Sequence, residues 1–144
     1  MKDIKVKGSG FVKLVPRKGA EDGVLFAIEG GRDVPFDIKR VYFITNLSKE
    51  KAARGKHAHK TLEQYIFCLK GSFTLGLDDG ETRQEIALAD PGIGVRLGAK
   101  LWHSMSGFSE DCVILVLADK QYDADDYLHD YDEFLAHVRK SETV

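Results

Sequence analysis

Short β-rich runs separated by turn residues recur between residues 11 and 118, and they constrain the fold more than any other feature. The runs begin at Phe11–Val15 and Val24–Ile28 and end with an apolar run at Cys112–Ala118. Turn residues stand between them, and turn signals every ~8–12 residues are typical of a β-sandwich or barrel. At one of these turns, Lys70-Gly71 has the spacing of a two-residue hairpin, so we expect the runs on either side of it to pair.

The pattern changes after Asp119, where apolar residues take helical spacing. Asp123–Leu128 and Asp132–Lys140 both begin with an aspartate, and Arg139-Lys140 close the second, as charges at helix ends do. We therefore expect one domain, residues 1–144, with an all-β barrel at about 8–118 and a short C-terminal helical tail at about 123–141.

Composition excludes several classes of function. With 144 residues, a net charge of −2 and a pI near 6.2, the chain has no general attraction for nucleic acid or for an anionic membrane. Residues 1–10 lack the apolar core of a signal peptide, and no run is long enough to span a membrane. Cys68 and Cys112 lie in apolar runs, as buried thiols do, so we expect a cytoplasmic protein without disulfides.

Two histidines stand two residues apart in Arg54-Gly55-Lys56-His57-Ala58-His59-Lys60. In a strand, residues i and i+2 point to the same face, so His57 and His59 present two imidazoles side by side. Imidazole titrates near neutral pH and also binds metals. The pair suits either proton transfer or metal binding.

The run Arg40–Thr45 places Arg40 and Tyr42 on one strand face, with Ile44. An arginine beside a tyrosine suggests a polar cavity. The alternative, equally open on this stretch alone, is a solvated Arg40 with a packed stem and a half-buried Tyr42.

The motif His57-x-His59, followed by Glu63, Gly71 and His103, resembles the paired motifs of the cupin superfamily. That resemblance implies a small double-sheet barrel whose interior often holds a metal on such side chains. Arg40 and Arg54 argue against a metal here, because cations would repel it. Arginine instead binds phosphate and carboxylate in a bidentate manner, which favours an anionic ligand.

A longer series of blocks resembles one family closely, the nucleotide-sugar 3,4-ketoisomerases that act on dTDP-4-keto-6-deoxyglucose. The blocks are collinear over roughly residues 20 to 135: Ile28-Glu29, Val34-Pro35-Phe36, Ile38 to Tyr42, Arg54 to Lys60, Leu62-Glu63-Gln64, Leu77 to Gly80, Trp102-His103, Tyr122 to Tyr127 and Asp130-Tyr131.

The resemblance implies a cupin barrel and an isomerisation without cofactor or metal, in unusual deoxysugar biosynthesis. It implies a dTDP-linked 4-keto-6-deoxy sugar as substrate, a homodimer, and a pyridoxal-phosphate-dependent aminotransferase that uses the product. It also implies site residues: catalytic roles for His57, His59 and Tyr42, and substrate binding by Arg40, Arg54, Trp102 and His103, with the last two walling one cavity.

The sequence leaves some points open. Family members commonly carry Arg-Gly or Tyr-Arg where this chain has Asp22-Gly23, so the configuration of the product at C4 is not determined. Which histidine acts as the base is also open. Two other functions fit the same barrel: a non-catalytic module that binds a nucleotide sugar, and a metal-dependent cupin enzyme.

Overall fold

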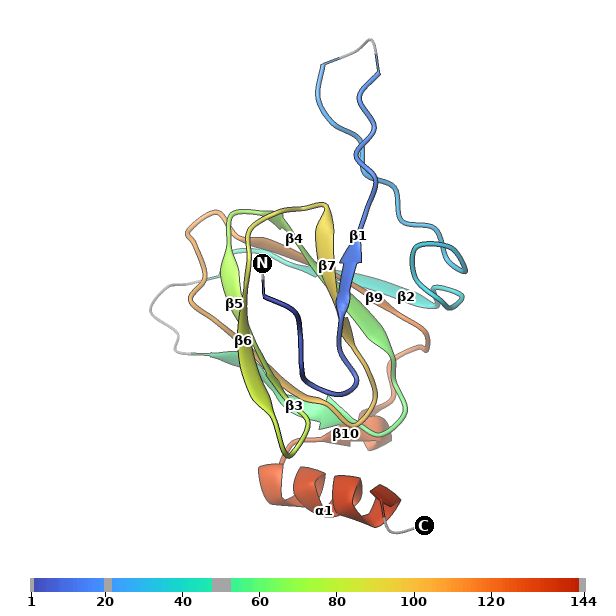
Figure 1. The fold of residues 1–144 in the computed structure, drawn as a ribbon, viewed down its shortest axis with the longest axis vertical. Helices are drawn as coiled ribbons and strands as arrows, with labels where there is room; N and C mark the ends of the chain where they lie inside the picture. The colour runs from blue at the N-terminus through green and yellow to red at the C-terminus, as the bar shows by residue number, and fades with distance from the viewer. Residues whose placement is uncertain (1, 20–21, 48–52, 143–144) are drawn as a thin grey trace.

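The computed structural model describes residues 2–19, 22–47 and 53–142, which form two antiparallel five-stranded sheets packed face to face (Figure 1). The first sheet has the order β1 (Phe11–Lys13), β7 (Ile93–Leu97), β4 (Gln64–Lys70), β9 (Val113–Ala118), β2 (Arg40–Ile44). The second has the order β10 (Tyr127–Leu128), β3 (Arg54–His59), β8 (Trp102–Ser106), β5 (Phe73–Asp78), β6 (Arg83–Leu88). The predicted all-β cupin barrel is confirmed.

The main core lies between the two sheets and follows from alternation along the strands. In β5, for example, Phe73, Leu75 and Leu77 are almost fully buried and point toward the first sheet. Cys68 and Cys112 lie in the same core as free thiols, which confirms the expectation for both.

The predicted hairpin at Lys70-Gly71 is wrong. The chain crosses there from one sheet to the other, since β4 pairs with β7 and β9 whereas β5 pairs with β6 and β8. Gly71 has φ 72°, and a Cβ on it would overlap the side chains of Ser109 and Asp111. The glycine thus allows the close approach of the segment 109–112, which local spacing alone cannot distinguish from a hairpin turn.

Two further segments differ from expectation. Val24–Ile28 does not form a strand, although Leu25 makes one antiparallel bridge to Arg17, with both backbone hydrogen bonds at 2.9 Å. Asp123–Leu128 is not a helix but a 3₁₀ turn, η1 (Ala124–Asp126), followed by β10. Tyr127 and Leu128 pair with β3 instead of forming a helix, and this pairing satisfies backbone hydrogen-bonding groups of both strands.

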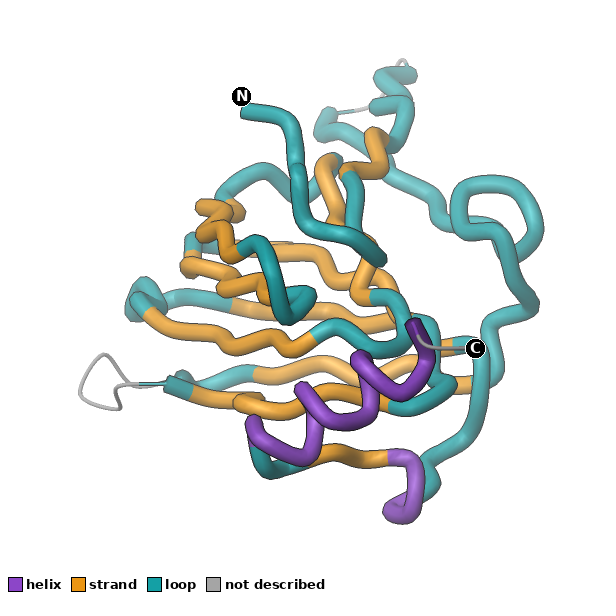
Figure 2. The backbone as a smooth tube through the Cα atoms, turned by 60° about the horizontal axis from the view of Figure 1, so that its bottom comes forward, coloured by secondary structure: helices purple, strands orange, loops and turns teal. Residues whose placement is uncertain are grey.

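The predicted second helix is present as α1 (Tyr131–Glu142), which lies across the end of the barrel next to β10 (Figure 2). Phe134 anchors it in a small cluster with Ala58 and Leu128. At the opposite end, the segment around Arg17 and Leu25 projects from the barrel as an arm (Figure 1). In the described part of the chain, no helix is both long and apolar enough to cross a membrane.

Candidate active site

A bulge in β3 brings His57 into register with His103 of β8. Arg54 pairs with Met105, and His57 pairs with His103. Between these two pairs β3 contains one more residue than β8. Gly55 lies in this bulge with φ 67°, and a Cβ there would come within 2.8 Å of Met105 Cε. The bulge therefore depends on glycine, and it aligns histidines from two strands.

The three histidines pack against one another inside the barrel. Ring centroids lie 4.9 Å apart for His57 and His59, 4.7 Å for His57 and His103, and 5.8 Å for His59 and His103. His59 is 2% and His103 3% exposed, and neither ring nitrogen of either residue has a hydrogen-bond partner among the described residues. These nitrogens are thus free to meet a ligand.

Burial keeps the three imidazoles neutral. It lowers the pKa of His57 to about 4, with help from His59 and His129, and it lowers the pKa of His103 well below the ordinary value. The pKa of His59 is also lowered to about 4, mainly by burial. At neutral pH each ring can therefore accept a proton.

Tyr127 and His129 complete an aromatic wall that sequence analysis did not assign to the site. The centroid of the Tyr127 ring lies 4.4 Å from that of His59 and 5.1 Å from that of His57. The Tyr127 ring also stacks on His129, with centroids 5.4 Å apart. Tyr127 falls in the segment expected to be helical, whereas its pairing with His59 in the ladder of β10 and β3 turns it toward the histidines. Its place in the block Tyr122 to Tyr127 was a signal for this role.

Arg40 and Tyr42 of β2 face the same region, as the alternation predicted. The Arg40 guanidinium stacks over Tyr42 at 4.6 Å and over Tyr122 at 5.3 Å, and its buried Nη1 lacks a hydrogen-bond partner among the described residues. The Tyr42 hydroxyl accepts a 2.7 Å hydrogen bond from Gln64, and burial raises the pKa of this phenol. Of the two alternatives for this stretch, the structure has the polar cavity.

A cavity of about 460 Å³ joins these groups at the surface. Its lining includes Arg40, Tyr42, Arg54, His57 and Tyr127, so five of the groups argued above meet there. His59 and His103 contact His57 from the buried side. The cavity thus combines an arginine from each sheet, Arg40 of β2 and Arg54 of β3, with the histidine cluster.

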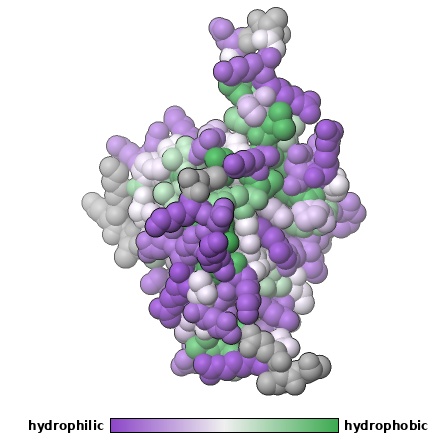
Figure 3. All heavy atoms as spheres, viewed as in Figure 1, coloured by the Kyte–Doolittle hydropathy of each residue, from purple (hydrophilic) through white to green (hydrophobic). Residues whose placement is uncertain are grey.

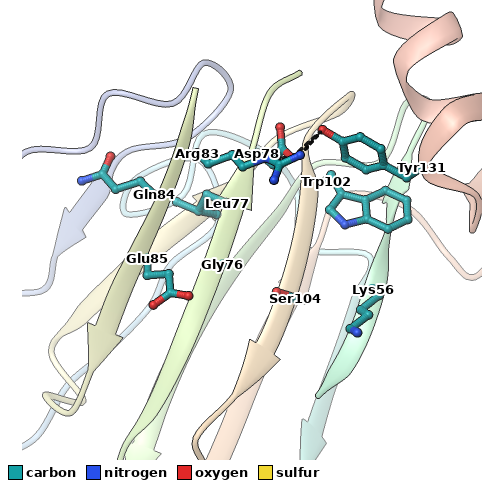
Figure 4. Close-up of a pocket in the computed structure, with 10 residues that line it drawn as sticks. All are labelled: Lys56, Gly76, Leu77, Asp78, Arg83, Gln84, Glu85, Trp102, Ser104 and Tyr131. Carbon is teal, nitrogen blue, oxygen red and sulfur yellow. Dashed lines mark hydrogen bonds and ion pairs between the residues drawn. The ribbon is translucent and has the colours of Figure 1, made fainter. Parts of the chain in front are cut away.

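Trp102 lies elsewhere, and the expectation that it walls one cavity with His103 is not met. Adjacent strand residues point to opposite faces, so Trp102 leaves the barrel interior and packs on Tyr131 at 5.3 Å and on Phe134 at 5.7 Å. It borders a larger groove of about 520 Å³ on the outer face of the second sheet (Figure 4). There Asp78 is paired with Arg83 at 3.0 Å and accepts a 2.7 Å hydrogen bond from Tyr131.

The three histidines could also hold a divalent metal ion, since one ring nitrogen from each lies within 4.8 Å of the others. Glu63, the carboxylate of the cupin motif, does not join them. It accepts hydrogen bonds from Arg96 at 2.7 and 2.9 Å and from the Ala99 backbone at 2.6 Å. The cluster thus offers three neutral nitrogen ligands and no anionic one among the described residues.

Comparison with known proteins gives consistent matches over most of the chain. Residues 8–139 match the family model described as FdtA: WxcM-like, C-terminal. The chain is 45% identical over 130 residues, 90% of each protein, to a TDP-4-oxo-6-deoxy-alpha-D-glucose-3,4-oxoisomerase of Aneurinibacillus thermoaerophilus.

Solved structures agree with that match. A double mutant of the QdtA 3,4-ketoisomerase from Thermoanaerobacterium thermosaccharolyticum, in complex with TDP, superposes with a TM-score of 0.90 at 40% identity, over 94% of this chain and 97% of that one. A histidine-to-asparagine mutant of the same enzyme, in complex with TDP-4-keto-6-deoxyglucose, gives a TM-score of 0.89 at 38% identity, over 94% and 96%.

Proposed function

The chain belongs to the FdtA-like (WxcM-like, C-terminal) family, and from this premise we propose that it is a sugar 3,4-ketoisomerase. The reaction converts dTDP-4-keto-6-deoxyglucose to a dTDP-3-keto-6-deoxyhexose. The observation that carries the proposal is the cluster of neutral, buried histidines at the wall of a cavity that also contains Arg40 and Arg54.

The chemistry requires two proton transfers on each side of an enediol. The 4-keto group makes the hydrogen on C3 acidic, so a base removes it while O4 gains a proton. The enediol then loses the proton on O3 and gains one at C4, which leaves a 3-ketone and a 4-hydroxyl. Atoms and electrons balance without an oxidant. Neutral imidazole can take and return each proton, and we assign this work to His57 and His59.

The remaining roles follow from charge and protonation. Tyr42, whose pKa is raised, stays protonated and can donate a hydrogen bond to a sugar oxygen as charge develops on it. Arg40 and Arg54 supply fixed positive charge for the pyrophosphate. His103, in register with His57, bounds the sugar from the buried side. Trp102 has no part in this site.

A metal-dependent enzyme is the second candidate, because three nitrogen ligands converge. His57, His59 and His103 would hold the ion, which would supply Lewis-acid polarisation of the 4-keto oxygen. Arg40 argues against a bound metal ion, because its positive charge is close enough to act on His59 and would repel a cation held there. Metal analysis of the purified protein separates the two candidates: stoichiometric zinc, iron or manganese, with activity lost to a chelator, would favour the metal enzyme.

The proposal includes a homodimer. Strand β2 is an edge strand, and its outward residues Val41 and Phe43 are 56% and 70% exposed. On the arm, Val15 and Leu25 are 75% and 57% exposed, and hydrophobic surface is visible there in Figure 3. A second copy would cover these residues and pair the open edge. Light scattering that gives a monomer at micromolar concentration would contradict the dimer.

The reaction also implies a further enzyme that uses its 3-keto product. A 3-ketone is a substrate for a pyridoxal-phosphate-dependent aminotransferase, which we propose as the next enzyme, in the cytoplasm, where nucleotide sugars are made.

The test of the proposed function is turnover of dTDP-4-keto-6-deoxyglucose, with the product trapped by a 3-aminotransferase. Trapping would also reveal the C4 configuration. Tight binding of the substrate without turnover would instead make the protein a nucleotide-sugar-binding module.

A further inference from the structure

A carboxylate stands next to the more buried of the two proposed acid–base histidines. Asp126, the last residue of η1, has its Oδ2 3.9 Å from His59 Nδ1. The Asp126 side chain is only 13% exposed and that of His59 only 2%. At this distance and burial, a charge on the imidazole would interact with the carboxylate with little screening by water.

The carboxylate is held in place by the turn that follows His59 in the chain. Its Oδ1 accepts hydrogen bonds from the Thr61 backbone at 3.0 Å and from the Thr61 hydroxyl at 2.7 Å, and its Oδ2 accepts one from the Leu62 backbone at 3.0 Å. In addition, the Lys60 backbone donates to the Asp126 carbonyl at 2.9 Å. These bonds fix the distance from the carboxylate to the imidazole.

None of the other groups around His59 raises its pKa as Asp126 does: they either lower it or are neutral. His57 comes from the same strand, His103 from β8, Tyr127 from β10, His129 from the segment after it, and Arg40 from β2. Arg40 and His129 lower the pKa of His59, as burial does, whereas Asp126 raises it. Asp126 is thus the charge that counters them.

We propose that Asp126 is a positioning residue for the isomerisation: its fixed carboxylate stabilises the imidazolium that forms when His59 holds the proton in transit. This inference rests on the proposed function, because it assigns His59 to the proton transfer. Asp126 does not contact the substrate in this account, and it acts only through His59.

The matched variants are Asp126→Asn and Asp130→Asn. Asparagine at 126 can still accept hydrogen bonds from Thr61 but carries no charge. Asp130→Asn removes one charge four residues further on, where the side chain accepts a 3.2 Å hydrogen bond from the Asp132 backbone at the start of α1, and asparagine serves there as well. Should Asp126→Asn not fold by circular dichroism, Asp126→Ser removes the same charge and keeps an acceptor.

Removal of the carboxylate should lower kcat roughly 10- to 100-fold and move the acid limb of the kcat/KM profile to lower pH, because His59 becomes a weaker base. Asp130→Asn should leave both unchanged. A rate loss with an unmoved acid limb would mean a purely structural role and would overturn the proposal, as would a parent-like profile.

A nuclear magnetic resonance titration of His59 in the resting protein tests the coupling without turnover. We expect the His59 pKa to fall in Asp126→Asn relative to the parent and to Asp130→Asn. An unchanged His59 pKa would refute the inference even if the enzyme isomerises its substrate. A lowered pKa in a protein without turnover would support the coupling and refute the proposed function.

Discussion

His57 of β3 lies directly opposite His103 of β8, with ring centroids 4.7 Å apart, because β3 takes up one extra residue at Gly55. If the same residues continued from the Arg54–Met105 pair in regular register, Lys56 would stand opposite His103, and the following side chains of β3 would exchange faces. The histidine cluster thus depends on a single irregularity in the ladder.

Replacement of Gly55 by alanine should therefore damage both stability and activity. The added Cβ meets Met105 Cε at 2.8 Å, and φ 67° is costly for alanine, by roughly 1–2 kcal/mol. We expect a lower melting temperature and a reduced kcat. Gly10→Ala is the control, because its Cβ would meet nothing within 4 Å. Equal effects of the two substitutions would show that the bulge does not require glycine.

The arginines should act mainly in binding. Arg54→Ala should weaken binding of dTDP by roughly 10- to 100-fold, since a charge-assisted hydrogen bond contributes about 1.5–3 kcal/mol. Isothermal titration calorimetry measures this. Arg83→Ala removes a cation from the outer groove and should leave the affinity unchanged. A similar loss in both variants would point to general electrostatics rather than a pyrophosphate site.

Trp102 should matter for stability and not for binding. Its ring packs on Tyr131 and Phe134, so Trp102→Leu should lower the free energy of unfolding while the affinity for dTDP is retained. Denaturant unfolding and calorimetry on the same preparations check both. A folded Trp102→Leu protein with weakened dTDP binding would show that the tryptophan contributes to the site after all.

The buried histidines should make stability depend on pH below neutrality. His59 has a pKa of about 4 in the folded protein and an ordinary value of 6.5, so between these values the unfolded chain binds a proton that the folded protein does not. The free energy of unfolding is therefore greatest above pH 6.5 from this source and falls as the pH drops toward 4. Denaturant titrations at pH 7.5 and pH 5 should differ less in His59→Asn than in the parent. An equal difference would contradict a buried neutral His59.

Much of this architecture could be predicted from local pattern. A period of two predicts that Arg40 and Tyr42 share one strand face and that His57 and His59 share another, and the structure has both. The resemblance of the sequence blocks to one family added the fold and the reaction.

Three of the misses share a physical cause, because each depends on a partner distant in sequence. Lys70-Gly71 has the spacing of a hairpin, but β4 finds its partners in β7 and β9. Tyr127 lies at a helical spacing from its neighbours, but pairing with β3 overrides it. Asp126 lies in the block Tyr122 to Tyr127, but nothing in the local sequence links it to His59, and only the fold brings the two together. Where a segment pairs with a strand distant in sequence, that pairing overrides its local structural propensity.

The histidine pair can be tested by conservative replacement. His57→Asn and His59→Asn keep a polar side chain of similar size but remove the titrating group, so turnover should fall by ~10²–10⁴-fold in each. Binding of dTDP should barely change. Parent-like rates in both variants would remove the histidines from the proton transfer.

Proton transfer through solvent-exchanging imidazoles is the central claim, and isomerisation in deuterated water tests it most directly. Incubation of the parent protein with dTDP-4-keto-6-deoxyglucose, followed by trapping with a 3-aminotransferase and mass spectrometry, should give a product with deuterium at C4. The label should form at greatly reduced rates in His57→Asn and His59→Asn. A 3-keto product that carries only protium at C4, formed at the parent rate in both variants, would contradict the account.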